Sequence, residues 1–449
     1  MMTSSYPRVD WKQLARLPGF RWFFLAMLVS LFGTGMNYAA VTWYVLGITH
    51  STVSVSWLLI LVTLPGLFVP PFGGVLIDRT DRRYLAIALD IIRSVLVLGT
   101  AALAAAHRLA LSEIYLMVFL LGVGFAVYWS AANSLVQELI PSSQLVTANA
   151  AVLVAVQGGM MAAGAVVGFI YEHTGLAGIL MIDGATYFIS GLCLIAVRRG
   201  WCPPQHSYAS APVLPPQQVE PAVEAAGTLT LPGPAGMSLR LNFSADLAEG
   251  IRYLRQQPLV LALGLTYACM MAGVISANVL VVALVKDLLA AGPRGYGFIE
   301  SGWAVGAVVG GLAASVISRR HPLGVLVAAL AILSVGHALF PYARWLGLAV
   351  AMNALFGGCR ALGGVLTQSA LMTSVPRRLM GRTLSAFSVI ATILQVAISF
   401  LLGWFAEHTN LFLAFALLGV LYAMAVVAAL RARSLTSAGR AIPLQSPAP

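Results

Sequence analysis

The chain has 449 residues, of which 59% are hydrophobic and only 9% carry a charged side chain. With a mean hydropathy of +0.89, it has too few charges to cover a water-soluble protein of this length, so lipid must solvate most of it. The net charge of +11 does not indicate nucleic-acid binding, because the basic residues fall in short clusters between apolar runs, which is typical of membrane topology.

Twelve apolar runs are each long enough to form a membrane-spanning helix. The sequence therefore predicts an all-α membrane protein. The runs cover residues 22–46, 53–77, 84–106, 114–137, 146–170, 177–197, 259–285, 295–317, 323–341, 345–371, 383–405 and 411–430.

A segment rich in proline, alanine and glycine, residues 203–236, separates the sixth run from the seventh and is typical of a flexible linker. Apolar residues then recur over 238–258, which fits either an amphipathic helix on the membrane surface or a plain linker. The predicted organisation is an N-terminal segment 1–21, a six-helix bundle 22–198, a linker 199–258, a second six-helix bundle 259–430 and a tail 431–449.

Lysine and arginine are distributed unequally between the segments that connect the runs. One alternate set of segments, which includes both termini, holds 20 of them, and the other set holds four. Because basic residues concentrate on the cytoplasmic side, both termini are predicted to be cytoplasmic. The first run is long enough to span a membrane and is not expected to be a cleaved signal peptide.

The two halves of the chain repeat one another. GGVLIDRTDRR at 73–83 recurs as GGLAASVISRR at 310–320, and the tripeptide EHT at 172–174 recurs at 407–409. The offsets are 237 and 235 residues, about half the chain. Duplicated membrane halves are typical of transporters.

Residues 74–83, GVLIDRTDRR, resemble the loop signature of the major facilitator superfamily, G-x-L-A-D-R-x-G-R-R/K. Ile77 replaces the small residue of the signature, and Asp81 replaces its second glycine. The resemblance implies two pseudo-symmetric bundles of six helices. Shorter stretches resemble the drug-efflux branch that includes macrolide and enterobactin exporters, namely DIIRS (90–94), LIPSSQLVTANA (139–150), IDGATYFIS (182–190), ADLAEGIRYL (245–254) and VPRRLMGR (375–382).

One departure from this branch lies late in the fifth helix. Ala163 and Gly164 stand where drug antiporters often carry Gly-Pro, and Val167 stands where they carry a glycine. The departure weakens the expectation of proton antiport.

The resemblance implies that the loop signature latches the two halves in the outward-facing state. An acid together with close-packing glycines exceeds what membrane anchoring needs, although the arginines alone could serve as topological anchors. The second copy has no acid at its end, so the latch is expected to be asymmetric. The proposed latch residues are Gly73, Gly74, Asp78, Arg79, Arg82 and Arg83.

Three charges lie within the first set of runs. Asp90 and Arg93 are three residues apart, so they share a helix face and can pair, either as a neutralised structural pair or in a coupling role. Asp183 has no charge nearby in the sequence. The resemblance places the third and sixth helices at the periphery of their half, which makes both acids scaffold rather than substrate ligands.

Two charges lie within the second set, Glu300 and Arg360, at different depths, so they need not pair. An unpaired arginine facing a cavity would favour an anionic or carbonyl-rich substrate, unless carbonyls beside Gly357 and Gly358 satisfy it. The resemblance implies that helices 1, 4, 7 and 10 line the cavity. The candidate cavity residues are Asn37, Tyr38, Tyr128, Asn133, Tyr267, Asn278, Asn353, Arg360 and Gln368.

No catalytic, metal or cofactor site is expected. The histidines are isolated, adjacent Glu and His do not face each other on a helix, and the repeated EHT is best explained as a helix-end cap. A phosphate-binding GxxxxGK[ST] sequence is lacking, which argues against ATP-driven transport. The chain is not expected to be an enzyme.

The predicted function is secondary active transport, most simply proton-coupled export of a small amphipathic molecule such as a drug, macrolide or siderophore. The protein is expected to be a monomer that crosses the bacterial inner membrane several times. A lysophospholipid flippase and a non-transporting membrane sensor on the same fold are the alternatives.

Overall fold

The computed structural model describes residues 16–69, 80–140, 145–197, 257–317, 322–375 and 377–440, and all regular elements in these ranges are helices. The first group of helices consists of α2 (Pro18–Thr49), α3 (Thr52–Thr63), α5 (Arg82–Ala105), α6 (Leu111–Leu139) and α7 (Leu145–Ala196). The second group consists of α9 (Pro258–Ala283) with the π-helical turn η2 (Leu284–Leu288), α10 (Gly292–Ile317), α11 (Pro322–Leu339) with the short 3₁₀ turn η3 (Phe340–Tyr342), α12 (Leu346–Ser374), α13 (Arg377–His408) and α14 (Leu411–Arg440).

Within the described ranges, eleven helices are long and apolar enough to cross a membrane, one fewer than the number of predicted runs. The difference lies in α7, which is continuous over the two runs predicted at 146–170 and 177–197. Its two helical segments meet at Gly175, whose φ of 61° and ψ of −163° leave the helical region. A residue with a side chain rarely adopts this backbone conformation, so the glycine permits the sharp change of direction.

Some helices extend beyond the apolar runs that predicted them. α13 begins at Arg377, although the run was predicted to start at 383. α14 continues to Arg440 through much of the segment predicted as a tail at 431–449. The length of an apolar run corresponds to the thickness of the bilayer core and not to the full length of the helix. Alanine, leucine and arginine also favour helix in water, so a helix can continue beyond the apolar run.

The start of α5 explains the departure from the loop signature at Asp81. The Asp81 carboxylate accepts hydrogen bonds from the backbone N–H of Arg83 at 2.9 Å and of Tyr84 at 3.3 Å. An aspartate at this position satisfies backbone donors that have no partner within the helix. Asp81 therefore caps α5.

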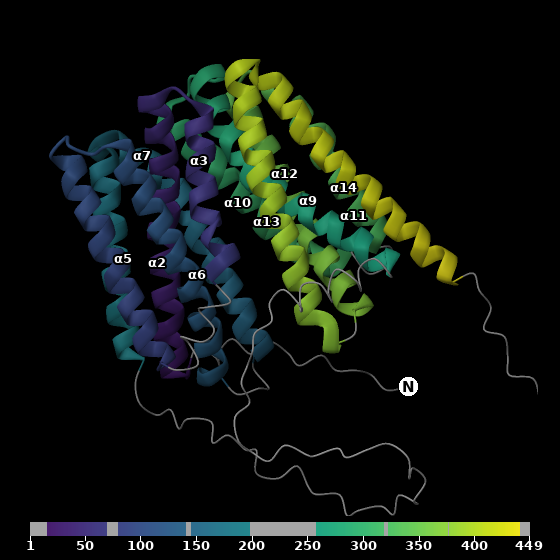
Figure 1. The fold of residues 1–449 in the computed structure, drawn as a ribbon, viewed down its shortest axis with the longest axis horizontal. Helices are drawn as coiled ribbons and strands as arrows, with labels where there is room; N and C mark the ends of the chain where they lie inside the picture. Colours follow the sequence, from purple (N-terminus) through teal and green to yellow (C-terminus); the bar gives the residue numbers. More distant parts are fainter. Residues whose placement is uncertain are drawn as a thin grey trace, which may run out of the picture.

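The helices of each group pack mainly on one another, α2 and α5 on α7 in the first group, and α10 on α12 and α11 on α14 in the second. The two groups meet through α7 with α10 and through α3 with α13. Figure 1 shows the groups converging where α2 joins α3 and α13 joins α14, and diverging toward the starts of α2 and α13. We call the first end the closed end and the second the open end.

Glycines bring α10 and α12 into backbone contact. A Cβ added at Gly302 would lie 2.9 Å from the Val350 carbonyl oxygen, and one at Gly306 or Gly310 would collide with the backbone of α12. Small residues at four-residue spacing allow this close approach between membrane helices. Gly310 belongs to the second copy of the repeat, so that copy contributes to helix packing.

Candidate functional site: a cavity between the two helix groups

A cavity of about 650 Å³ lies between the two groups and is lined by both. Its walls come from α2, α3, α6 and α7 in the first group and from α9, α10, α11, α12 and α14 in the second. The volume lies within the range of sites for drug-sized molecules. The lining is therefore broader than the four helices that the resemblance implied.

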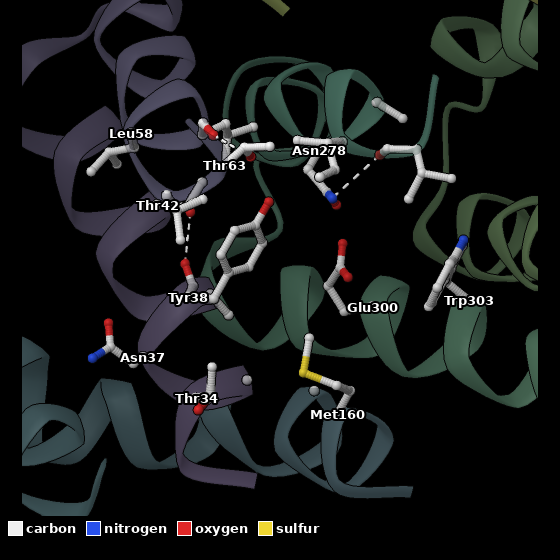
Figure 2. A pocket seen from close by; sticks show the side chains of 18 of the residues that line it. Thr34, Asn37, Tyr38, Thr42, Leu58, Thr63, Met160, Asn278, Glu300 and Trp303 are labelled. Atoms are coloured by element: carbon white, nitrogen blue, oxygen red, sulfur yellow. Dashed lines mark hydrogen bonds between the residues drawn. The ribbon is translucent and has the colours of Figure 1, made fainter. Parts of the chain in front are cut away.

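Five of the predicted cavity residues line it: Asn37, Tyr38, Asn278, Asn353 and Arg360. Glu300, singled out as an intramembrane charge, also lines it. Figure 2 shows Tyr38, Asn278 and Glu300 directed toward the same space, with Asn37 pointing away from Glu300.

The other four predicted residues are not among the residues that line this cavity. Tyr128 is buried, and its ring lies 4.3 Å from the guanidinium carbon of Arg93. Asn133 donates to the Trp129 carbonyl oxygen of its own helix at 2.9 Å. Tyr267 packs against an apolar cluster of α9, α12 and α13, and Gln368 is exposed on α12. All four lie on helices that contribute to the cavity.

Sequence reasoning missed an aromatic wall. The imidazole of His337 on α11 stacks on Phe356 at 4.3 Å and on Tyr422 at 4.9 Å between ring centroids, and all three residues line the cavity. His337 Nδ1 lies 2.7 Å from the Leu333 carbonyl oxygen. A histidine in the interior of the apolar run 323–341 was the signal available in the sequence.

The guanidinium of Arg360 is poorly satisfied by the described residues. Its Nη2 donates to the thioether of Met271 at 3.4 Å, a weak acceptor, and its Nε has no hydrogen-bond partner there. The alternative involving backbone carbonyls is not realised at the glycines, because Gly357 and Gly358 face α10. Donor capacity therefore remains for a molecule in the cavity.

The carboxyl group of Glu300 forms no hydrogen bond or ion pair with any described residue. The hydroxyl groups of Tyr38 and Tyr296 are close enough for a charge on Glu300 to act on both. Tyr296 in turn stacks on Trp43 of α2, with ring centroids 6.0 Å apart. Glu300 thus lies where the two helix groups face one another.

Asp90 and Arg93 of the first group form a buried ion pair and are not among the cavity-lining residues. Asp90 forms the predicted ion pair with Arg93, with side chains 0% and 3% exposed, and accepts a hydrogen bond from Ser190 at 2.7 Å. The Arg93 guanidinium lies between the rings of Tyr128 and Tyr187, at 4.3 and 4.5 Å. This arrangement fits the structural alternative for the pair.

Asp183 is fully buried between α7 and α2. Its Oδ2 accepts a hydrogen bond from Asn37 Nδ2 at 2.6 Å, while its Oδ1 has no hydrogen-bond partner among the described residues. Gly33 covers Oδ1, since a Cβ there would lie 2.6 Å from it. Asp183 is held within the first group and does not reach the second.

Comparison with known proteins decides the family. The sequence profile of the Major Facilitator Superfamily matches residues 23–394, most of the chain. The chain belongs to the major facilitator superfamily. It is therefore a multi-pass membrane transporter and not an enzyme.

Its relatives and structural neighbours are transporters. It is 27% identical to the enterobactin exporter EntS of Escherichia coli O6:K15:H31 (strain 536 / UPEC) over 373 residues, 81% of this chain and 80% of that one. Over 374 residues, with the same coverage, it is 28% identical to EntS of Shigella boydii serotype 4 (strain Sb227).

Solved structures share the fold at low sequence identity. The POT family transporter PepTSo has a TM-score of 0.68 at 12% identity, covering 94% of this chain and 99% of its own. A bacterial homologue of the lysosomal transporter Spinster, in an inward-facing and unoccupied conformation, has a TM-score of 0.62 at 16% identity, covering 94% and 98%.

The superfamily signature is only partly within the described ranges. Gly73, Gly74, Asp78 and Arg79 lie outside them. Arg82 forms an ion pair with Glu138 at the end of α6. Arg83 donates to the carbonyl oxygens of Leu194 at 2.9 Å and Ile195 at 2.7 Å, at the end of α7. Both arginines thus join helix ends of the first group at the open end.

The repeated EHT tripeptides occupy equivalent places at the closed end. His173 and His408 each lie within hydrogen-bond distance of a carbonyl oxygen four residues earlier, at 2.8 and 3.1 Å. The acids reach across to the other group. Glu172 pairs with Arg294 of α10 at 2.6 Å, and Glu407 accepts from the Ser51 hydroxyl at 2.5 Å and the Val53 N–H at 3.0 Å.

The prediction of simple helix-end caps therefore covers only part of what these tripeptides do. Glu172 of α7, in the first group, binds Arg294 near the start of α10. Glu407 near the end of α13, in the second group, binds Ser51 at the start of α3. Glu172 and Glu407 connect the two groups at the closed end in a pseudo-symmetric way.

Proposed function

We propose that this transporter exports a small amphipathic molecule by alternating access, driven by protons that enter in exchange. One observation carries the proposal: a cavity shared by both groups, shut at one end, presents two charged side chains without ionic partners among the described residues, Arg360 and Glu300. Charged groups in the membrane are costly unless they serve binding or coupling.

The proposed topology has twelve spans, both termini in the cytoplasm and a bacterial inner membrane as the location. The excess of lysine and arginine in the segments on the side of the termini supports this orientation. The open end is then cytoplasmic, and the structure represents an inward-facing state. Two six-helix bundles, 22–198 and 259–430, are proposed to rock about the cavity in a monomer.

The proposed latch acts in the opposite state, when the cytoplasmic end is shut. Gly74 and Asp78 are proposed to bind the second bundle there, with Arg79 as their partner in the signature. Arg82 and Arg83 support this role by holding the ends of α6 and α7 next to the loop.

The proposed substrate carries an anionic or carbonyl-rich group on an aromatic or apolar body. Arg360 supplies the donors that would bind such a group, and His337, Phe356 and Tyr422 supply a flat apolar wall. A siderophore is the first candidate, since the exporter of enterobactin is a relative. Macrolides and other amphipathic drugs are the next candidates.

Uptake into inverted membrane vesicles with an imposed pH gradient tests this function, with enterobactin and erythromycin as probes. We expect uptake of at least one probe that collapses when an ionophore removes the gradient. Uptake that ignores the gradient would contradict proton coupling. Binding without uptake would contradict transport and favour a sensor. Vesicles carrying Arg360→Leu are the matched control.

A further inference from the structure

We infer that Glu300 is the acid whose protonation closes the outer end of the transporter. The inference rests on the proposed proton-coupled function and names the group that performs the coupling. A proton can shift a conformational equilibrium only if its binding site differs between the two states. The question is therefore which intramembrane acid changes its surroundings when the closed end opens.

Glu300 is located at the contact that must separate. A Cβ added at Gly164 of α7 would lie 3.3 Å from the Cβ of Glu300, and one at Gly297, one turn earlier on α10, would lie 2.8 Å from the Gly164 carbonyl oxygen. Near the same contact, Gly168 approaches the Pro293 carbonyl oxygen, at 2.5 Å from an added Cβ. The helices of the two groups thus touch at the base of Glu300.

The head of Glu300 also faces the other group. Tyr38 of α2, in the first group, is directed toward it (Figure 2) and interacts with it electrostatically, while Asn278 of α9 faces it from its own group. When α7 and α10 separate, Tyr38 moves away from Glu300 with the first group, and outside water replaces it. In the closed arrangement the carboxylate is packed against the first group and has no cation among the described residues, so it is less well solvated there than in the open one.

The two other intramembrane acids do not meet this condition. Asp90 is paired with Arg93 on its own helix, and Asp183 is bonded to Asn37 within the first group. A rigid rotation of the group carries these partners along. Their surroundings remain the same in both states, so protons on them cannot bias the equilibrium.

The sign of the effect agrees with export. A proton that binds Glu300 from the outside neutralises it and stabilises the closed outer end, which presents the cavity to the cytoplasm. Loss of that proton to the cytoplasmic water restores the charge and favours opening to the outside. One proton enters for each return of the empty carrier, as an antiporter requires.

Other titratable groups at the closed end could add a pH response. Facing Glu300 itself, they are Tyr38 of α2 and Tyr296 of α10, and no described cation lies beside it. Farther out, Glu172 pairs with Arg294, and His50 Nδ1 lies 3.4 Å from Lys286 Nζ. A variant of Glu300 is needed to separate its contribution from theirs.

The test measures the opening of the outer end without a substrate. Spin labels are attached to Arg108→Cys and Arg344→Cys, which are exposed in the loops after α5 and before α12, in protein whose native cysteines are replaced by alanine. Their separation is measured in nanodiscs from about pH 5 to about pH 9, where one coupled proton changes the ratio of closed to open by at most about tenfold per pH unit.

We expect the wild-type protein to close as the pH falls. Glu300→Gln should stay closed at every pH, whereas Glu300→Asp and Asp183→Asn should keep the response. An unchanged response in Glu300→Gln, or its loss in Asp183→Asn with a normal melting temperature, would overturn the inference. So would a wild-type protein that does not respond to pH.

The outcome is separable from the proposed function. If the labels respond through Glu300 but vesicles transport neither enterobactin nor erythromycin, the coupling site stands and the proposed substrate class fails. If gradient-driven uptake persists in Glu300→Gln, the exporter stands and Glu300 is not the coupling acid.

Discussion

The two helix groups treat their intramembrane charges in opposite ways. In the first group, Asp90 and Arg93 neutralise each other, and Asp183 is sealed under Gly33 and bonded to Asn37. In the second group, Glu300 and Arg360 both line the cavity and have no ionic partner among the described residues. The intramembrane charges of the first group therefore form contacts within that group, whereas those of the second group face the cavity and are available to bind substrate or protons.

The largest expected effect comes from removing the buried ion pair of the first group. Arg93→Leu leaves Asp90 buried without its cation, and removing one partner of a buried pair costs about 3–5 kcal/mol of stability. Thermal unfolding of the purified protein in detergent measures it. The double variant Asp90→Asn with Arg93→Gln should recover most of the loss. An unchanged melting temperature for Arg93→Leu would show that the pair is not structural.

The same substitution in the other half is expected to affect binding. Arg360→Leu orphans no buried anion, so the melting temperature should stay near that of the wild type. A hydrogen bond to a charged group contributes about 1.5–3 kcal/mol, so enterobactin affinity should fall about 10- to 150-fold. Tryptophan fluorescence titration measures this affinity, and equal affinity in wild type and variant would refute the role of Arg360.

Gly33→Ala disturbs the close packing of α2 over Asp183, and so tests whether that packing stabilises the first group. The added Cβ would collide with Thr186 and approach Asp183 Oδ1 to 2.6 Å, and overpacking of this kind costs about 1–3 kcal/mol. Gly47→Ala is the matched control on α2, because its Cβ would meet nothing within 4 Å. If both variants have the same melting temperature, the close contact at Gly33 does not contribute to stability.

The smallest expected effect concerns the two acids that join the groups at the closed end. Glu172→Gln removes a partly exposed ion pair with Arg294, worth about 0.2–1 kcal/mol. Glu407→Gln keeps an acceptor oxygen for Ser51 and Val53, so it should favour opening of the closed end less than Glu172→Gln does. The label pair at positions 108 and 344 compares them. A larger shift for Glu407→Gln would show that Glu407 contributes more than Glu172 to holding the closed end together.

Parts of this arrangement follow from the sequence, because they depend on local spacing. The apolar runs predicted the helices, and the three-residue spacing of Asp90 and Arg93 predicted their pair. The repeat predicted that the EHT tripeptides are equivalent. Their contacts across the groups were not predictable, because Glu407 and Ser51 are 356 residues apart.

The cavity lining was the hardest part to predict. Tyr128 lies on α6 next to the cavity residue Trp129, yet its ring packs on Arg93 within the first group. In a soluble helix the polar side marks the face toward water. In a membrane helix the faces toward lipid and toward neighbouring helices are about equally apolar, so the sequence does not fix the rotation of the helix.

The most direct test of the account compares uptake of enterobactin per folded molecule in inverted vesicles for two matched variants. We expect the double variant Asp90→Asn with Arg93→Gln, which keeps the first group neutral, to retain gradient-driven uptake, and Arg360→Leu to lose it while folding normally. A folded first-group variant that loses uptake, beside an Arg360→Leu protein that transports as the wild type does, would contradict the account.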